Sequence, residues 1–403
     1  MSDKILTFLQ YGYIPKYEKH LLSLISDNTE KDKIYDISYL RKKSTDILKT
    51  IIKQHLDNTS ASLHVVPLSG GLDSRLILSV LLEYVDHDKV LTVTLGSDDT
   101  WDFEIGQLVA DYVGVKNKAI RLNKYDFSSG DLISVAERTK RPTRLFERAF
   151  NGLAWKDLAG RSNTIVWSGY MGGELAGGHL PERKIDNWDD ALGHFVKKNR
   201  LTSRLTPKSF NPKSVLPVKP ITGDLEFIEQ LDYGVRQPCF IRPTVVHPNA
   251  KKPFLHDEWI SFWMKVPRDK RVGRKLYKEI VLYAYPNLFS LPSDASYGLK
   301  ISDPVWKKRF YKLSEAVKRY FSKWSGWEYT HPGTNYLNFE SAFRSTMFEL
   351  AERQLLDLKQ RDVVTWVDID DIWSAHQAGE DYSDEIRILV SLEIYMKAGA
   401  FFC

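Results

Sequence analysis

The chain carries a short apolar run, a Gly-Gly turn and an amphipathic stripe in immediate succession. Residues 63–68 (LHVVPL) predict a short buried strand, and Gly70-Gly71 ends it. Beyond the turn, apolar side chains recur at helical spacing: Leu76, Ile77, Val80, Leu81 and Tyr84. A strand that turns directly into a helix is typical of α/β folds.

The alternation repeats along the first half of the chain. Further strands are predicted at 90–95, 117–122 and 164–167, with helical spacing around 101–112 and 144–159. Strands separated by helix-length segments pair in parallel through right-handed crossovers. We therefore expect an α/β fold with a parallel sheet and flanking helices, which binds its ligand outside the carboxyl ends of the strands.

The second half of the chain is predicted to be mainly helical. Its expected helices lie near 256–265, 275–285, 304–324, 339–359 and 384–398. The chain then divides into three parts. Residues 1–50 form a helical lead-in, 51–185 the α/β core, and 186–403 the helical C-terminal part.

Composition and charge limit the partners and the cellular location that we expect for the protein. The 403 residues carry a net charge of +5, an excess too small to require nucleic acid as a partner. Cys239 and Cys403 are the two cysteines, which gives no disulfide framework and no thiolate zinc site. The sequence shows no signal-peptide core and no apolar run of about 18 residues that would span a membrane. We expect a cytoplasmic protein.

The segment 67–75 (PLSGGLDSR) is suited to binding an anion. Its small residues, which let backbone amides approach a ligand, are Ser69, Gly70, Gly71 and Ser74. Amides and the dipole at a helix N-terminus favour phosphate. Asp73 would repel a phosphate unless a divalent cation lay between them, so we predict that it binds Mg²⁺. The structural alternative is an ordinary turn with an N-capping Asp or Ser.

The string SGGLDS differs from the common phosphate-binding motifs. The sequence contains neither GxxxxGK[ST] nor GxGxxG. SGGLDS resembles the signature of the PP-loop ATP pyrophosphatases, enzymes that split ATP between its α and β phosphates and transfer AMP to an acceptor.

A second glycine-rich stretch, SGYMGGELAGGH at 168–179, follows the predicted strand at 164–167. It resembles the second ATP-site motif of the asparagine synthetase superfamily. Weaker similarities to that family follow in the same order at 11–15, 100–114, 253–267 and 273–300. The resemblance therefore extends over almost the whole chain.

The resemblance implies a reaction and a set of site residues. A carboxylate would attack the α phosphate of ATP, with Mg²⁺, to give an acyl-adenylate and pyrophosphate, and an amine or ammonia would then form an amide. The implied nucleotide-binding positions are Leu68, Ser69, Gly70, Gly71, Asp73, Ser74, Leu95 and Gly169. Leu95 would hold the adenine through its backbone.

Several positions depart from the family pattern. Tyr170 stands where asparagine synthetases carry an acidic residue and β-lactam synthetases a tyrosine; it either assists proton transfer or lines the pocket. Gly173 replaces an aspartate that holds magnesium, so we expect Glu174 to be the second metal ligand beside Asp73. Ser296 replaces the family's lysine.

Candidates for the missing positive charge are Lys275, Lys278 and Lys300. We expect Lys275 and Lys300 to be catalytic, because a cation is needed against the phosphates and the developing oxyanion.

The source of the amine is a further departure. The family's glutaminase uses an N-terminal cysteine, whereas Ser2 follows Met1 here, and residues 1–50 would be a remnant of the glutaminase linker. We expect a free amine or ammonium as nucleophile, or a separate protein that delivers ammonia. Two alternatives stay open: another PP-loop adenylation, such as modification of a nucleobase, or a decayed site that binds a nucleotide or a partner.

Three other features favour structural roles. The helix at 304–324 combines basic and aromatic residues, and we expect a solvated basic face over a packed aromatic stripe. Binding to an anionic polymer or membrane surface is the alternative. His256-Asp257-Glu258 is expected to be a solvated helix start, and His179 to be structural rather than part of the pocket lining.

Overall fold

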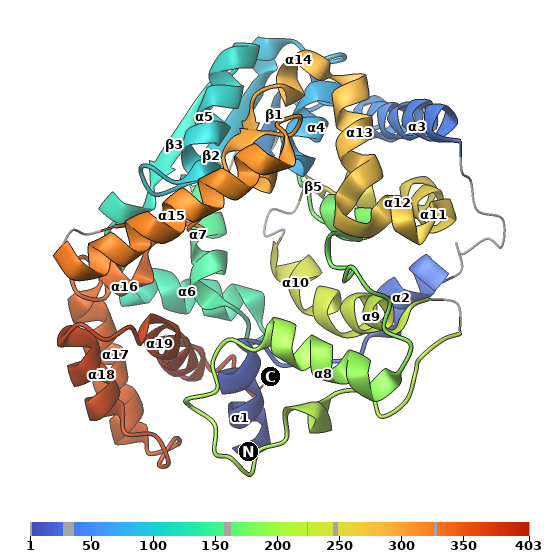
Figure 1. Cartoon of the computed structure of the whole chain (residues 1–403). Coiled ribbons are helices and arrows are strands. Elements are labelled where there is room, and N and C mark those ends of the chain that lie inside the picture. Colours follow the sequence, from blue (N-terminus) through green and yellow to red (C-terminus); the bar gives the residue numbers. More distant parts are fainter. Residues whose placement is uncertain are drawn as a thin grey trace.

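A five-stranded parallel sheet lies in the upper part of the molecule as drawn in Figure 1, with the strand order β3-β2-β1-β4-β5. The computed structural model describes residues 2–26, 36–156, 163–223, 225–244, 249–325 and 329–402. The strands are β1 (Leu63–Pro67), β2 (Val90–Gly96), β3 (Lys116–Arg121), β4 (Thr164–Trp167) and β5 (Ala250–Lys251). The expected α/β class with parallel pairing is confirmed.

The edge strand β5 was not predicted. It pairs with β4 through Val166 and Ala250, so the second half of the chain contributes to the sheet. A strand of two residues is too short to show a periodic pattern, so β5 could not be predicted from local spacing.

Neighbouring residues of the strands contribute to different apolar clusters, because successive side chains point to opposite faces of the sheet. Val66 of β1 belongs to a large core, whereas its neighbour Val65 packs with Val93 and Val166 in a smaller cluster. Helices that contribute to the large core include α3 (Ile37–Asp57), α4 (Asp73–Leu81), α5 (Trp101–Val113), α11 (Asp257–Lys265) and α13 (Lys275–Ala284).

A second core joins the start of the chain to its end (Figure 1). It is formed by α1 (Ser2–Tyr11), α6 (Ser129–Thr139), α7 (Leu145–Lys156), α16 (Phe339–Ala342), α17 (Phe348–Arg361), α18 (Ile369–Gln377) and α19 (Ser383–Lys397). The other helices are α2 (Lys19–Ser26), α8 (Trp188–Asn199), α9 (Phe227–Leu231), α10 (Gln237–Thr244), α12 (Arg268–Arg271), α14 (Pro286–Phe289) and α15 (Val305–Ser325).

The single helix predicted at 339–359 is wrong. The chain breaks between α16 and α17, where the amide of Met347 donates to the carbonyl of Ala342 over 2.8 Å. Phe343 and Met347 are both buried at the break, so the turn directs two large side chains into the same core. Helices α6 and α18 were not predicted.

The division at residues 50 and 185 stays a prediction. Helix α3 runs through residue 50 without interruption, and β5 joins the sheet from beyond residue 185. The first boundary therefore falls inside an element of secondary structure.

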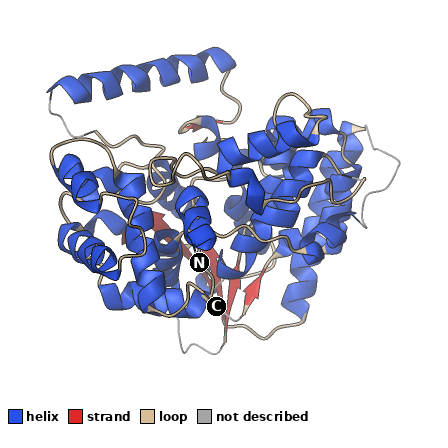
Figure 2. Cartoon of the chain, turned by 90° about the horizontal axis from the view of Figure 1, so that it is seen from below, coloured by secondary structure: helices blue, strands red, loops and turns tan. Residues whose placement is uncertain are grey.

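Helix α15 stands apart from the other helices (Figure 2). The expectation that its aromatic stripe is packed is wrong, because Trp306, Phe310 and Tyr320 are each 69% exposed. Among the described residues, no helix is both long and apolar enough to cross a membrane.

Candidate active site

A cavity of about 430 Å³ opens at the carboxyl ends of β1, β2 and β4. The predicted site residues that line it are Leu68, Ser69, Gly71, Asp73, Ser74, Leu95, Gly169, Tyr170 and Glu174. Both glycine-rich segments therefore face one space. Parallel sheets bind ligands at this edge because the loops that follow neighbouring strands converge there.

The two glycine-rich loops touch at distances that exclude larger residues. A Cβ atom on Gly169 would lie 3.0 Å from the amide nitrogen of Ser74, and one on Gly172 would lie 2.8 Å from Cγ of Asp73. The amide of Gly173 donates to Oδ2 of Asp73 over 2.9 Å. The second glycine-rich loop thus packs directly against the first.

Gly70 supports the first loop from behind the lining. Its amide donates to Oδ1 of Asp102 over 3.1 Å, and its carbonyl accepts from Nη2 of Arg75 over 3.3 Å. A Cβ atom at Gly70 would lie 2.9 Å from the carbonyl oxygen of Trp101. Gly70 therefore fixes the loop against the start of α5.

Asp73 is a half-buried residue whose carboxylate has one buried oxygen without a hydrogen bond. Its Oδ1 accepts no hydrogen bond from the described residues. Burial, and then the charge of Glu174, raise its pKa to about 7, although Tyr277, Arg274 and the Gly173 amide act in the opposite direction. A divalent cation would satisfy the free oxygen and offset the repulsion between the two carboxylates.

Asp73 and Glu174 stay the predicted Mg²⁺ ligands, and two carboxylates alone would need further ligands from a bound phosphate. In the described part of the chain, no three His, Cys, Asp or Glu side chains gather as a potential metal site. Phosphate oxygens and water would complete the shell, as Mg²⁺ commonly requires.

Arg274 supplies a cation that the sequence did not reveal. It lines the cavity at the start of α13 and follows Gly273, and both residues have left-handed backbone angles, with φ of 58° and 67°. A non-glycine residue in that region is uncommon and often marks a functional site. The Gly-Arg pair ahead of a predicted helix was the available signal.

The predicted lysines lie elsewhere. Lys275 and Lys300 are exposed and do not line the cavity. Lys278 is half-buried, and its Nζ donates to the carbonyl of Gly273 over 3.0 Å. Their catalytic role stays a prediction without support from the geometry.

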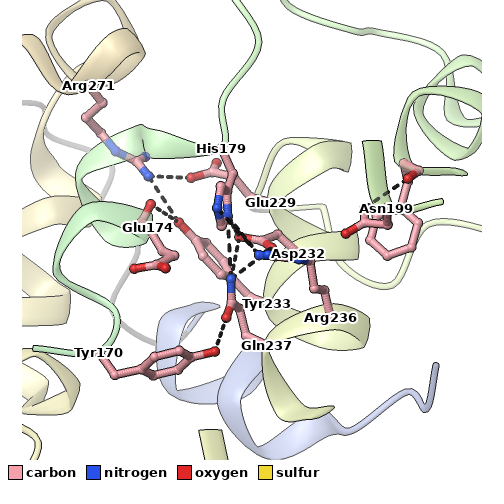
Figure 3. Close-up of polar contacts among 11 residues, drawn as sticks. Tyr170, Glu174, His179, Asn199, Glu229, Asp232, Tyr233, Arg236, Gln237 and Arg271 are labelled. Carbon is pink, nitrogen blue, oxygen red and sulfur yellow. Dashed lines mark hydrogen bonds and ion pairs between the residues drawn. The ribbon is translucent and has the colours of Figure 1, made fainter. Parts of the chain in front are cut away.

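Tyr170 begins a chain of buried polar groups (Figure 3). Its hydroxyl donates to Oε1 of Gln237, whose Nε2 donates to Oδ1 of Asp232 over 3.0 Å. Nδ1 of His179 lies 2.8 Å from Oδ2 of the same carboxylate. His179 is thus linked to the main cavity through Asp232, Gln237 and Tyr170. Its own side chain lines a second cavity of about 230 Å³.

The Tyr170 phenol is held in its protonated form by burial and by a neighbouring carboxylate. Burial, and then the negative charge of Glu174, raise its pKa well above its ordinary value. A neutral phenol donates a hydrogen bond and does not accept a proton from an amine at neutral pH. The structure therefore favours Tyr170 as a donor or as part of the lining.

A buried ion pair and a tyrosine support the backbone of the second loop at Glu174 and Leu175 (Figure 3). Arg271 donates to Oε1 of Glu229 over 2.5 Å and to the carbonyl of Leu175 over 3.2 Å. Tyr233 donates to the carbonyl of Glu174 over 3.2 Å. Met171, just before Gly172, is buried with φ of 74°, so the loop is strained and needs these supports.

Asp102 and Asp294 form a second carboxylate pair on the cavity wall. Burial, and then the charge of Asp294, raise the pKa of Asp102 to about 7. Neither residue was predicted. Asp102 could have been predicted as a site residue, because it is acidic and lies in the first turn of the helix that follows the second strand. The sequence around Asp294 carries no such signal.

The triplet at 256–258 begins a helix. His256 is the N-cap of α11, and its Nδ1 accepts from the amide of Glu258 over 3.4 Å. Asp257 and Glu258 occupy the first turn, where acidic side chains stabilise the helix dipole.

Comparison with protein families gives one match. Residues 46–226 match the model of the family described as asparagine synthase. The matched range contains β1 to β4 and both glycine-rich loops of the cavity. No curated protein matches the chain.

Proposed function

Since residues 46–226 match the asparagine synthase family, we propose that the chain is a member of this superfamily of ATP-dependent, amide-forming ligases and that it adenylates a carboxylate substrate. The reaction would release pyrophosphate, and ammonia or an amine would then displace AMP to form an amide. The carboxylate, the amine and the release of AMP are parts of the proposal.

The cavity supports binding of the triphosphate of ATP. The small residues of the first loop border it where α4 begins, and the dipole of that helix favours an anion. Arg274 adds a cation on the facing wall. Asp73 and Glu174 would hold Mg²⁺, which supplies charge neutralisation at the phosphates.

Arg274 also offers an explanation for the unusual glycine in the second loop. A Cβ atom at Gly173 would lie 3.3 Å from Oδ2 of Asp73 and 3.5 Å from Nη1 of Arg274. The space that a family aspartate would enter is thus bordered by a guanidinium. We infer that Arg274 offsets phosphate charge in this chain, next to the position where relatives carry a second magnesium-binding aspartate.

The proposed steps balance without a redox partner. An oxygen of the substrate carboxylate forms a bond to the α phosphorus, and the bond from that phosphorus to the oxygen bridging to the β phosphorus breaks. The amine then attacks the acyl carbon, AMP leaves, and the amine loses a proton. The protein's contribution is to position the reactants and offset charge, which accounts for much of the catalysis of such reactions.

The contact of Gly173 and Asp73 is the observation that carries the proposal, because it puts both family motifs around one carboxylate. The test is incubation of the protein with α-labelled ATP, Mg²⁺, a carboxylate library and hydroxylamine. We expect AMP and pyrophosphate from the wild type, and at least a hundredfold less from Asp73→Asn.

Asp111→Asn, on the exposed side of α5, is the matched control and should keep wild-type turnover. Products of ADP and inorganic phosphate would overturn the proposal. Binding of ATP without AMP formation for any acid would favour a nucleotide-binding role without catalysis.

A further inference from the structure

Helix α15 presents a continuous apolar stripe to solvent. Figure 2 shows this helix set apart from the other helices of the molecule. Its exposed apolar side chains are Trp306 69%, Phe310 69%, Leu313 63%, Val317 50%, Tyr320 69% and Phe321 64%. Exposed apolar patches on this scale mark interaction surfaces rather than ordinary surface residues.

The stripe runs along one side of the helix. Its members from Trp306 to Tyr320 alternate spacings of four and three residues, which places them within an arc of about 100°. Such a stripe normally faces the protein core. Here it faces away from the core.

The polar side of α15 is the side that contacts the body. Glu315 is 4% exposed and accepts hydrogen bonds from Lys318 and Tyr329. On the same side, Tyr311 packs against Trp101 with 5.8 Å between ring centroids. The helix is therefore anchored through Glu315 and Tyr311, and its apolar side is exposed to solvent.

Basic residues lie both beside the exposed stripe and on the side of α15 that faces the body. Those with described side chains are Lys307, Lys308, Arg309, Lys312, Lys318 and Arg319. Of these, Lys307 pairs with Asp303, Lys308 donates to the carbonyl of Ile301, and Lys318 donates to Glu315. Glu315, the acidic residue of the helix, is buried on the opposite side. The outer surface of α15 therefore combines large aromatic groups with positive charge.

We propose that α15 docks the protein onto an anionic lipid surface. A helix with Trp, Phe and Leu on one side and Lys and Arg beside them lies in the membrane interface, with its apolar side inserted among the acyl chains. The basic flanks match negatively charged headgroups. At 21 residues the helix is about 30 Å long and would lie parallel to the membrane surface.

Charge and side-chain type argue against a second copy of the chain as the occupant. Two α15 stripes brought together would bring their basic flanks together as well, and like charges there are destabilising. The stripe also carries Trp306, Phe310 and Tyr320 where helix pairs prefer Leu, Ile or Val.

Docking would hold the cavity near the membrane. Trp101, which contacts α15 through Tyr311, also lies against Gly70 of the first glycine-rich loop. Binding of α15 to lipid does not depend on the reaction proposed above, so an experiment can contradict one proposal and leave the other standing.

The test is co-sedimentation of the full chain with vesicles. We expect binding to vesicles of equal parts phosphatidylglycerol and phosphatidylcholine, and at least tenfold weaker binding to phosphatidylcholine alone. The double variant Trp306→Ser/Phe310→Ser should lose at least tenfold in binding, and Arg309→Glu about tenfold. ATP consumption in the absence of lipid should be the same in both variants as in the wild type.

The matched control removes two exposed tyrosines elsewhere, Tyr112 (53%) and Tyr283 (56%), by substitution with serine. It should bind vesicles like the wild type. Absence of wild-type binding, equal binding to neutral vesicles, or equal loss in the control would overturn the proposal. So would a dimer that Trp306→Ser/Phe310→Ser abolishes while vesicle binding persists.

Discussion

The amide of Gly173 donates a hydrogen bond to Oδ2 of Asp73 over 2.9 Å, across a sequence separation of 100 residues. Asp73 begins α4, whereas Gly173 lies in the loop that follows β4. The sheet makes this contact possible because β1 and β4 are neighbours with parallel pairing. The position of one carboxylate is thus set by two loops, so a change in either loop should move it.

Gly172→Ala tests this dependence directly. The new Cβ would lie 2.8 Å from Cγ of Asp73 and 2.8 Å from Phe254, so one of them must shift. We expect AMP formation to fall by a factor of ten to a hundred, and the free energy of unfolding by about 1–3 kcal/mol. Gly223→Ala, which meets nothing within 4 Å, is the control for a glycine substitution and should change neither quantity. Unaltered AMP formation in Gly172→Ala would contradict this account.

The first loop and the sheet could be predicted because their signals are local. A buried strand, a Gly-Gly turn and an amphipathic stripe each leave a pattern within a few residues, and β1 and α4 follow that pattern. Leu95 and Gly169 are brought to the same cavity because parallel strands end at a common edge.

The rest of the site depends on contacts that no local pattern encodes. Arg274 reaches the cavity through two successive left-handed residues, and Gln237 accepts a hydrogen bond from Tyr170 although the two are 67 residues apart in the sequence.

The orientation of α15 was mispredicted for a related reason. An amphipathic pattern defines a stripe, but only the packing of Glu315 decides which side faces the body.

Glu174→Gln should raise the requirement for Mg²⁺. The charge of Glu174 acts on Asp73, and a neutral amide would remove one anionic ligand from the pair. We expect the Mg²⁺ concentration that gives half-maximal AMP formation to rise at least tenfold, measured at saturating ATP. Glu104→Gln, on the exposed side of α5, serves as the control. The same Mg²⁺ dependence in Glu174→Gln and wild type would remove Glu174 from the metal site.

Arg274 and the predicted lysines can be separated by three single variants. Arg274→Gln removes the guanidinium that lines the cavity, and we expect kcat/KM for ATP to fall by a factor of a hundred or more. Lys275→Gln and Lys300→Gln change exposed side chains outside the lining, so each should retain activity within about twofold. Steady-state assays of pyrophosphate release make the comparison. A large loss in either lysine variant, with Arg274→Gln active, would restore the lysines as the catalytic cations.

Tyr170→Phe distinguishes a hydrogen-bond donor from a base. Burial first, and then the charge of Glu174, raise the pKa of Tyr170, so the phenol stays protonated at neutral pH. We therefore expect about a tenfold loss of amide formation with an unchanged pH profile between about pH 6 and 9. Tyr39→Phe, an exposed tyrosine, is the control. Disappearance of an alkaline or acidic limb in Tyr170→Phe would instead identify the phenol as the group that transfers the proton.

The pair of Asp102 and Asp294 should make stability depend on pH. Burial, and then the charge of Asp294, raise the pKa of Asp102 to about 7, whereas an aspartate in an unfolded chain titrates near about 4. Between these values the folded protein holds a proton that the unfolded chain has lost. The free energy of unfolding must therefore fall as the pH rises through this window, by up to about 1.4 kcal/mol per unit.

In Asp102→Asn the amide oxygen can still accept from Gly70, but the side chain no longer titrates. Urea unfolding at pH 5 and pH 7.5 should show that the variant loses on the order of 2 kcal/mol less than the wild type over this interval. Asp111→Asn should keep the wild-type difference, since that side chain is exposed. An equal fall in Asp102→Asn and wild type would mean that Asp102 is already ionised in the folded protein at pH 5.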